Sequence, residues 1–256
     1  HPVEHGGFGF GMKWMMGWMH DTFRYFKIPH ADRFFAQDTL TFSMMYYYNE
    51  KFMLPLSHDE IVHGKSPMIY KMPGYESEKF SNLRLLYTYM YTHPGAKLLF
   101  MGNEFGQSSE WNYKSELKWD LLEFDSHRKL KDCVKALGHL YKNEPALYEL
   151  QFDPNGFEWI ELNKRMDGIL AFKRKGINRA NDLLVIMNIS NKAFHHYPLH
   201  ISGKTKWTEI FNSNDIAFWG TGNYMNDRIN IKIINKKLKT CEINLAIPPL
   251  SAMIFK

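Results

Sequence analysis

The fold of this chain is decided by the stretch Phe52-Met53-Leu54-Pro55-Leu56-Ser57-His58-Asp59-Glu60. Its first five residues are apolar, which is typical of a buried strand, and four polar residues follow without a break. The interior of an α/β barrel is packed with apolar side chains, and its chemistry lies at the carboxyl ends of the strands. The stretch therefore predicts a barrel strand over residues 52–56 that ends in a polar site.

His58 and Asp59 are the candidate site residues of this stretch. Neighbouring side chains leave the backbone in different directions, but both can reach one ligand where a strand turns into a loop. A carboxylate accepts hydrogen bonds from hydroxyl groups and an imidazole can donate or accept them, so the pair suits a polyhydroxylated substrate. A polar surface loop without a function is the alternative, because four residues form a weak motif.

Longer strings of the sequence help to decide between a substrate site and a polar surface loop. Leu54 to Glu60 is followed by His63-Gly64-Lys65 and by Lys71-Met72-Pro73-Gly74, and a second string runs Lys97-Leu98-Leu99-Phe100-Met101-Gly102-Asn103-Glu104-Phe105-Gly106-Gln107. From about Gly6 to the C-terminus, the chain resembles the 1,4-α-glucan (glycogen) branching enzymes of the α-amylase superfamily. The two strings are similar to the ends of the seventh and eighth strands of their barrel. The combination is more specific to branching enzymes than to amylases at large.

The resemblance implies a transferase of glycogen biosynthesis, which cleaves an α-1,4 glucan chain and transfers it to a 6-hydroxyl as an α-1,6 branch. It implies that Asp59 is the acid that stabilises the transition state and that His58 binds the substrate. The retaining chemistry also needs a nucleophile and a general acid. In the family these lie on earlier strands, so we expect the N-terminal half to be missing and the fragment to be inactive alone. Glu60 and Glu104 are interpreted as structural carboxylates, and no cofactor or metal is expected.

The resemblance implies the C-terminal part of a (β/α)8 TIM barrel (strands 6 to 8) over residues 1–148. The pattern of the later residues predicts an antiparallel β-sandwich over residues 149–256. The resemblance places the sixth strand within residues 1–13. Apolar spacing predicts helices over 14–26, 39–50 and 78–93, the last ended by Pro94 and Gly95, and a final barrel helix over 126–143. A continuous apolar run over 96–101 predicts a strand buried on both faces. Regularly spaced short runs predict the sandwich strands, at 157–162, 169–173, 183–189, 193–199, 207–211, 229–234, 241–247 and 253–255.

Composition excludes several classes of function. The net charge of +5 is spread along the chain, and the only basic cluster, Asn235-Lys236-Lys237-Leu238-Lys239, reads as a turn and not as a nucleic-acid site. The two cysteines form neither a disulfide framework nor a metal spacing, which fits a reducing cytoplasm. No apolar run reaches the roughly 18 residues of a membrane span, and no signal peptide is apparent. The first residue is His1, which suggests a fragment.

Two alternatives remain from the sequence. Aromatic residues make up 16% of the chain, so the sandwich could be the working part of a non-catalytic α-glucan-binding module. A fragment of an α-amylase-type hydrolase is disfavoured by His63-Gly64-Lys65 and by the string around Glu104. Because part of a barrel leaves parallel strands with open edges, we expect the fragment to aggregate, dimerise or be marginally stable, whereas the sandwich is expected to fold alone.

Overall fold

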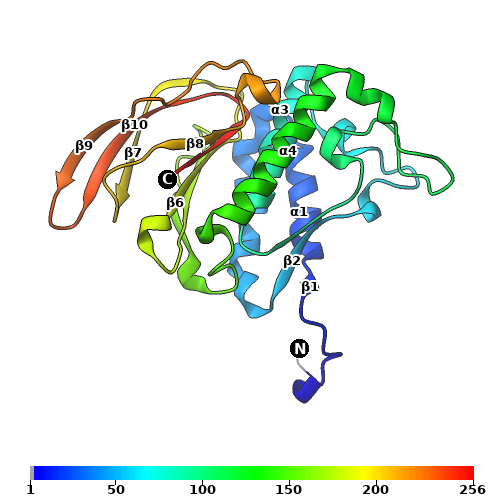
Figure 1. The fold of residues 1–256 in the computed structure, drawn as a ribbon, viewed down its shortest axis with the longest axis horizontal. Helices are drawn as coiled ribbons and strands as arrows, with labels where there is room; N and C mark the ends of the chain where they lie inside the picture. The colour runs from blue at the N-terminus through cyan, green and yellow to red at the C-terminus, as the bar shows by residue number, and fades with distance from the viewer. Residues whose placement is uncertain (1–2) are drawn as a thin grey trace.

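The computed structural model describes residues 3–256. His1 and Pro2, where the sequence suggested a truncated start, lie outside the described residues. The first part of the chain forms a three-stranded parallel sheet with its helices, and the second part forms two antiparallel sheets (Figure 1). The elements of the first part are β1 (Lys13–Trp14), α1 (Met16–Phe26), α2 (Gln37–Thr41), β2 (Phe52–Leu56), α3 (Glu76–Thr92), β3 (Ala96–Leu99) and α4 (Asp125–Asn143).

The central strand of the parallel sheet is β2, whose predicted bounds are confirmed. It pairs with β1 on one side and with β3 on the other, and Leu54 lies opposite Lys97. Helix α3 connects β2 to β3, so this unit is the expected βαβ crossover with parallel neighbours. The helix begins at Glu76, two residues before the predicted start, because the Glu78 carboxylate accepts the N–H of Tyr75 (2.9 Å) and closes the first turn.

A tight turn carries the chain from α3 into β3. Gly95 has a φ of +118°, which only glycine adopts readily. A Cβ atom at this position would lie 3.1 Å from the backbone oxygen of Phe52. Strand β3 was expected to be buried on both faces, but each of its residues is only half-buried. The reason is its place at the edge of the sheet, where it has one neighbouring strand among the residues described.

The predicted helix over 39–50 is wrong. The chain forms the short helix α2 and then two 3₁₀ turns, Phe42–Met45 and Tyr47–Asn49. Three consecutive tyrosines cannot all face one side of a helix, and here Tyr47 is buried while Tyr46 and Tyr48 are half-buried. The Tyr47 hydroxyl donates to the backbone oxygen of Gln151 (2.7 Å), a contact to the second part of the chain that fixes the local turn.

The second part is the predicted sandwich, and the structure contains a strand for each of the predicted runs. The five-stranded sheet has the order β4-β5-β6-β11-β8 and the three-stranded sheet the order β7-β10-β9, with every pair antiparallel. The strands are β4 (Phe157–Glu161), β5 (Ile169–Arg174), β6 (Leu183–Asn188), β7 (Phe194–Ser202), β8 (Glu209–Asn212), β9 (Asn230–Asn235), β10 (Thr240–Ile247) and β11 (Ser251–Phe255). Figure 1 shows β7, β9 and β10 on the side of the molecule away from the helices.

The five-stranded sheet is covered on both faces. On β5, Ile169 and Ala171 point into the core between the two sheets, whereas Leu170 and Phe172 join the core formed with the helices. This alternation follows from the two-residue period of a strand. One hydrophobic core therefore continues from the parallel sheet and its helices into the sandwich. The division of the chain at residue 148/149 stays a prediction.

Three buried arginines cross the junction between the two parts. Arg33 donates to the backbone oxygen of Ile189 (3.2 Å) and Arg84 to that of Ser213 (2.7 Å). Arg174, at the end of β5, donates in the opposite direction to Thr92 (2.8 Å). Within residues 3–256 no carboxylate forms an ion pair with any of the three. Burial lowers the pKa of each guanidinium to about 10, so all three remain charged at neutral pH.

No helix within residues 3–256 is long and apolar enough to cross a membrane. Both cysteines are free and buried.

Candidate functional site

The candidate site lies where β2 and β3 end side by side. The N–H of Phe100 donates to the backbone oxygen of Leu56 (3.0 Å), which brings the residues after both strands to one edge of the sheet. After β2 the chain turns at once into the 3₁₀ turn His58–Glu60. Ser57 begins this turn, because its Oγ accepts the N–H of Asp59 (3.3 Å) and donates to Asp59 Oδ2 (3.2 Å). The change from apolar to polar sequence therefore coincides with the end of the strand, as expected for a barrel.

The structure brings the two predicted site residues together. His58 Nε2 lies 3.4 Å from Asp59 Oδ1, and the side chains are 43% and 41% exposed. Because Ser57 holds Oδ2, the carboxylate keeps a fixed orientation while Oδ1 faces the imidazole. Both side chains can therefore meet one ligand from the solvent side. Their roles in binding and catalysis stay predictions.

Two aromatic rings pack beside the imidazole of His58. The sequence analysis did not identify either of them as a candidate site residue. The ring of His58 lies 5.6 Å from that of Phe100 and 6.1 Å from that of Trp111, measured between centroids. Phe100 and Trp111 meet edge to face at 5.4 Å, an arrangement that favours a fixed pair. Phe100 follows β3 directly, so its position at a strand end was a usable signal. Trp111 lies in the following loop, and its contact with His58 depends on tertiary structure.

The two other carboxylates in these strings, Glu60 and Glu104, have different surroundings. Glu60 is paired with Lys65 Nζ (3.1 Å) and lies 3.5 Å from His20 Nε2, which supports its interpretation as a structural group. Glu104 lies in the 3₁₀ turn Asn103–Phe105 and is half-buried. It forms no hydrogen bond or ion pair within the described chain, so its structural interpretation remains a prediction.

A buried lysine lies behind the loop that follows the site. Lys71 is 5% exposed, its Nζ donates to the backbone oxygen of Lys65 (2.5 Å), and it lies 5.6 Å from the centre of the Phe23 ring. Burial is the main cause that lowers the pKa of Lys71 to about 8. The hydrogen bond fixes the C-terminal side of the loop. No cluster of three or more His, Cys, Asp or Glu residues suited to a metal occurs in the described part of the chain.

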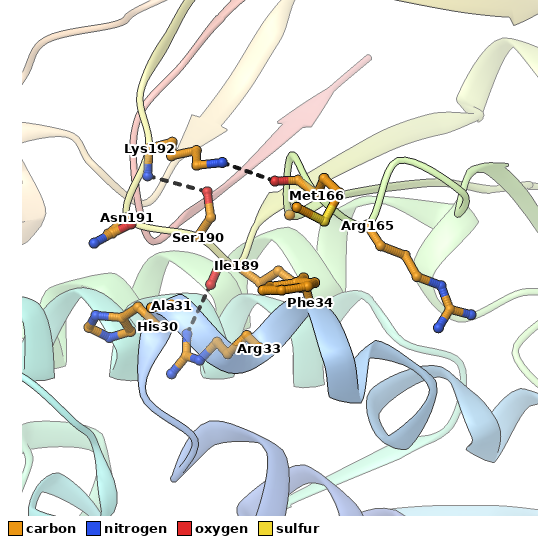
Figure 2. Close-up of a pocket in the computed structure, with 11 residues that line it drawn as sticks. His30, Ala31, Arg33, Phe34, Arg165, Met166, Ile189, Ser190, Asn191 and Lys192 are labelled. Carbon is orange, nitrogen blue, oxygen red and sulfur yellow. Dashed lines mark hydrogen bonds between the residues drawn. The ribbon is translucent and has the colours of Figure 1, made fainter.

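A cavity of about 190 Å³ lies elsewhere, between the 3₁₀ helix His30–Ala36 and the turn after β6 (Figure 2). Its charged side chains are already bonded within the chain. Lys192 Nζ donates to the backbone oxygen of Met166 (3.1 Å) and the Arg33 guanidinium to that of Ile189, while Arg165 is paired with Asp38. The lining therefore leaves no free charged group to recognise a ligand.

The chain is similar to known proteins over its whole length. Residues 159–256 match the family model described as the alpha amylase C-terminal all-beta domain. The whole chain is 45% identical over 258 residues to the 1,4-alpha-glucan branching enzyme GlgB of Prochlorococcus marinus (strain MIT 9301), of which it covers 34%. It is 44% identical over 260 residues to GlgB of Geobacillus stearothermophilus, of which it covers 40%. This chain is homologous to the C-terminal part of the GlgB branching enzymes.

Solved structures extend the comparison to the fold. The structure of an alpha-amylase from H.orenii matches with a TM-score of 0.59 and 16% identity, over 97% of this chain and 49% of the amylase. The structure of a variant of AmyP in complex with maltotriose matches with a TM-score of 0.62 and 11% identity, over 96% of this chain and 50% of AmyP. The predicted fold class and the resemblance to branching enzymes are confirmed. The chain spans between 34% and 40% of the length of the two GlgB relatives named above.

Proposed function

We propose that this chain is the C-terminal part of a 1,4-α-glucan branching enzyme and supplies the transition-state stabiliser of its active site. The observation that carries the proposal is the identity of 45% over the whole chain to a GlgB enzyme. The position of His58 and Asp59 at the carboxyl end of β2 supports it, because that edge of a barrel bears the chemistry.

The proposed reaction breaks an α-1,4 bond with retention and forms an α-1,6 bond. It requires a carboxylate nucleophile and a carboxylic acid about 5 Å apart. We assign neither role to this chain and expect both from the remainder of the enzyme. Asp59 would accept hydrogen bonds from hydroxyl groups of the sugar ring, and these contacts would strengthen as the ring distorts towards the transition state. His58, supported by Phe100 and Trp111, would orient the same ring.

The test uses the complete enzyme, with branching measured by the loss of the iodine complex. Asp59→Asn should preserve the fold and lower kcat by at least about 30-fold, equivalent to about 2 kcal/mol, because it removes a preorganised charge from the transition state. His58→Ala should be milder, since neutral hydrogen bonds are weaker than those of a carboxylate. Glu104→Gln should be milder still.

Asp120→Asn provides the control, because it makes the same change at an exposed position outside the site. Turnover of Asp59→Asn close to that of the wild type would contradict the proposed role. The 256-residue chain alone should transfer no glucan, and activity from it would show that the assignment of the missing carboxylates is wrong.

The sandwich offers little support for the alternative of a non-catalytic glucan-binding module. Aromatic rings that bind sugars by stacking have to be displayed on a surface. Within residues 157–256 the exposed large apolar side chains include no Phe, Trp or Tyr, and Trp207 and Phe211 are 4% and 6% exposed. The aromatic content of the sandwich is therefore mainly packing.

A further inference from the structure

The loop after the His58–Glu60 turn has an unusual backbone. His63 has a φ of 52°, Gly64 of 83° and Ser66 of 70°, all in the left-handed region. For residues other than glycine this conformation is unfavourable, and it persists only where the surroundings hold it. In a turn that contains left-handed residues, neighbouring backbone N–H groups can point towards a common centre and hold an anion.

The anion at this centre is the side chain of Glu110, from the loop after β3. Glu110 Oε2 accepts the N–H of Gly64 (3.0 Å) and Oε1 accepts the N–H of Ser66 (2.8 Å). These two hydrogen bonds are the largest causes that hold the pKa of Glu110 below its ordinary value. Each oxygen of the Glu110 carboxylate already accepts an N–H of this loop. The carboxylate therefore holds the loop in place, like a clamp, and does not act as a catalytic acid.

The contacts of Glu110 continue into the candidate site. The N–H of Trp111 donates to the backbone oxygen of Ile61 (3.2 Å), and the N–H of Ile61 donates to that of His58 (2.9 Å). The ring of Trp111 also contacts His58. A displacement of Glu110 would therefore release the loop at Gly64 and disturb the support of the imidazole at the same time.

We propose that Glu110 is a positioning residue, whose carboxylate joins the loops after β2 and β3 and thereby fixes the orientation of His58 and Asp59. For its effect on catalysis the inference rests on the function proposed above. The geometric part does not, because it concerns only contacts within this chain. Glu110→Gln is the sharpest test, since it keeps the size of the side chain but replaces one acceptor oxygen with an NH₂ group that faces an N–H donor.

The first experiment is NMR on the complete enzyme, with isotope labels on its glycine, serine and histidine residues. In Glu110→Gln, the amide protons of Gly64 and Ser66 should exchange about tenfold faster or more, because hydrogen bonds to a charged acceptor are lost. The ring signals of His58 should shift as well. Glu116→Gln is the matched control, because Glu116 is an exposed carboxylate of the same loop. Unchanged amide exchange, or changed exchange with unchanged His58 signals, would overturn the proposal.

The second experiment is a double-mutant cycle in the complete enzyme. If Glu110 acts through Asp59 and His58, Glu110→Gln should lower kcat/KM about tenfold alone but less than about threefold in the Asp59→Asn background, because coupled residues are not additive. Equal losses in both backgrounds would show a merely structural effect and overturn the proposal. If Asp59→Asn itself retained activity, the proposed function would fail, and the NMR result would still decide whether Glu110 orients His58.

Discussion

Arg174→Met is expected to lower the stability of the chain more than any surface substitution. Arg174 is fully buried, and its guanidinium donates to the backbone oxygens of Thr92 (2.8 Å), Leu147 (3.2 Å) and Gly156 (3.3 Å). Thr92 is the last residue of α3, so the cation also lies at the negative end of the helix dipole. Methionine replaces the aliphatic part of the arginine side chain but has no donor, and it leaves these carbonyl groups without a partner.

The magnitude follows from opposing contributions. Each hydrogen bond from a charged donor contributes about 1.5–3 kcal/mol, so three bonds contribute about 4.5–9 kcal/mol. Removing the cation also recovers its desolvation cost, which is several kcal/mol for a buried ion. The difference between these contributions gives an expected net loss of about 2–5 kcal/mol.

The assay is equilibrium unfolding in urea, followed by tryptophan fluorescence and circular dichroism on the same samples. Arg179→Met is the control, because the Arg179 side chain is 58% exposed. We expect the control to lie within about 0.5 kcal/mol of the wild type. In Arg174→Met the two signals should also separate, because the contacts of β5 with α3 are weakened. A loss below about 1 kcal/mol with coincident signals would refute the reasoning.

Three further predictions concern single groups. Gly138→Ala in α4 should stabilise the chain by about 0.5–1 kcal/mol in urea melts, because a Cβ there meets nothing within 4 Å. Gly95→Ala should instead destabilise the chain by about 1–3 kcal/mol, because Gly95 has a φ of +118°. The opposite order of stabilities would contradict the turn geometry. Burial lowers the pKa of His93 to about 3 from its ordinary value of 6.5. Between pH 6.5 and pH 3 the unfolded state therefore binds a proton that the folded state does not. The stability should fall by up to about 1.4 kcal/mol per pH unit as the pH drops from 6.5 towards 3. His93→Gln should lack this part of the slope in melts at pH 7 and pH 5, and equal slopes would argue against a buried neutral imidazole. Cys133 and Cys241 are buried and burial raises the pKa of both thiols, so a thiol reagent such as DTNB should react with them only on unfolding, and fast reaction of the native chain would contradict their burial.

The sequence predicted the elements that have a local signal. Strand β2 was located residue for residue, because an apolar run ended abruptly in Ser57 and His58. Helix α3 was located to within two residues, since Pro94 and Gly95 mark its end and its apolar spacing is regular. The parallel arrangement of β2 and β3 followed from the helix between them.

Features that depend on distant contacts were not predictable from local pattern. The stretch over 39–50 has helical composition, but Tyr47 reaches Gln151 and the chain forms 3₁₀ turns instead. The apolar run of β3 reads as fully buried, although an edge position leaves it half-exposed. The clamp by Glu110 joins two loops, and nothing in the spacing of Gly64 and Ser66 identifies their acceptor.

The expected independence of the sandwich also has to be revised. Its five-stranded sheet has an apolar face that joins the helices in one core, with Leu170, Phe172 and Val185 among the buried residues. An isolated sandwich would expose this face, so we now expect it to aggregate. The prediction that the open edges at β1 and β3 make the 256-residue chain associate is unchanged, and light scattering on both pieces tests the two statements together.

The arginine contacts across the junction have a consequence for building chimaeras of this chain with its homologues. A recombination point at residue 148/149 would separate Arg174 from Thr92 and Leu147, and Arg33 and Arg84 from Ile189 and Ser213. These acceptors are backbone oxygens, so the foreign partner would need the correct loop geometry more than the correct side chains. Exchanges that keep residues 13–256 in one block should retain these contacts and yield folded hybrids more often than exchanges of the sandwich alone.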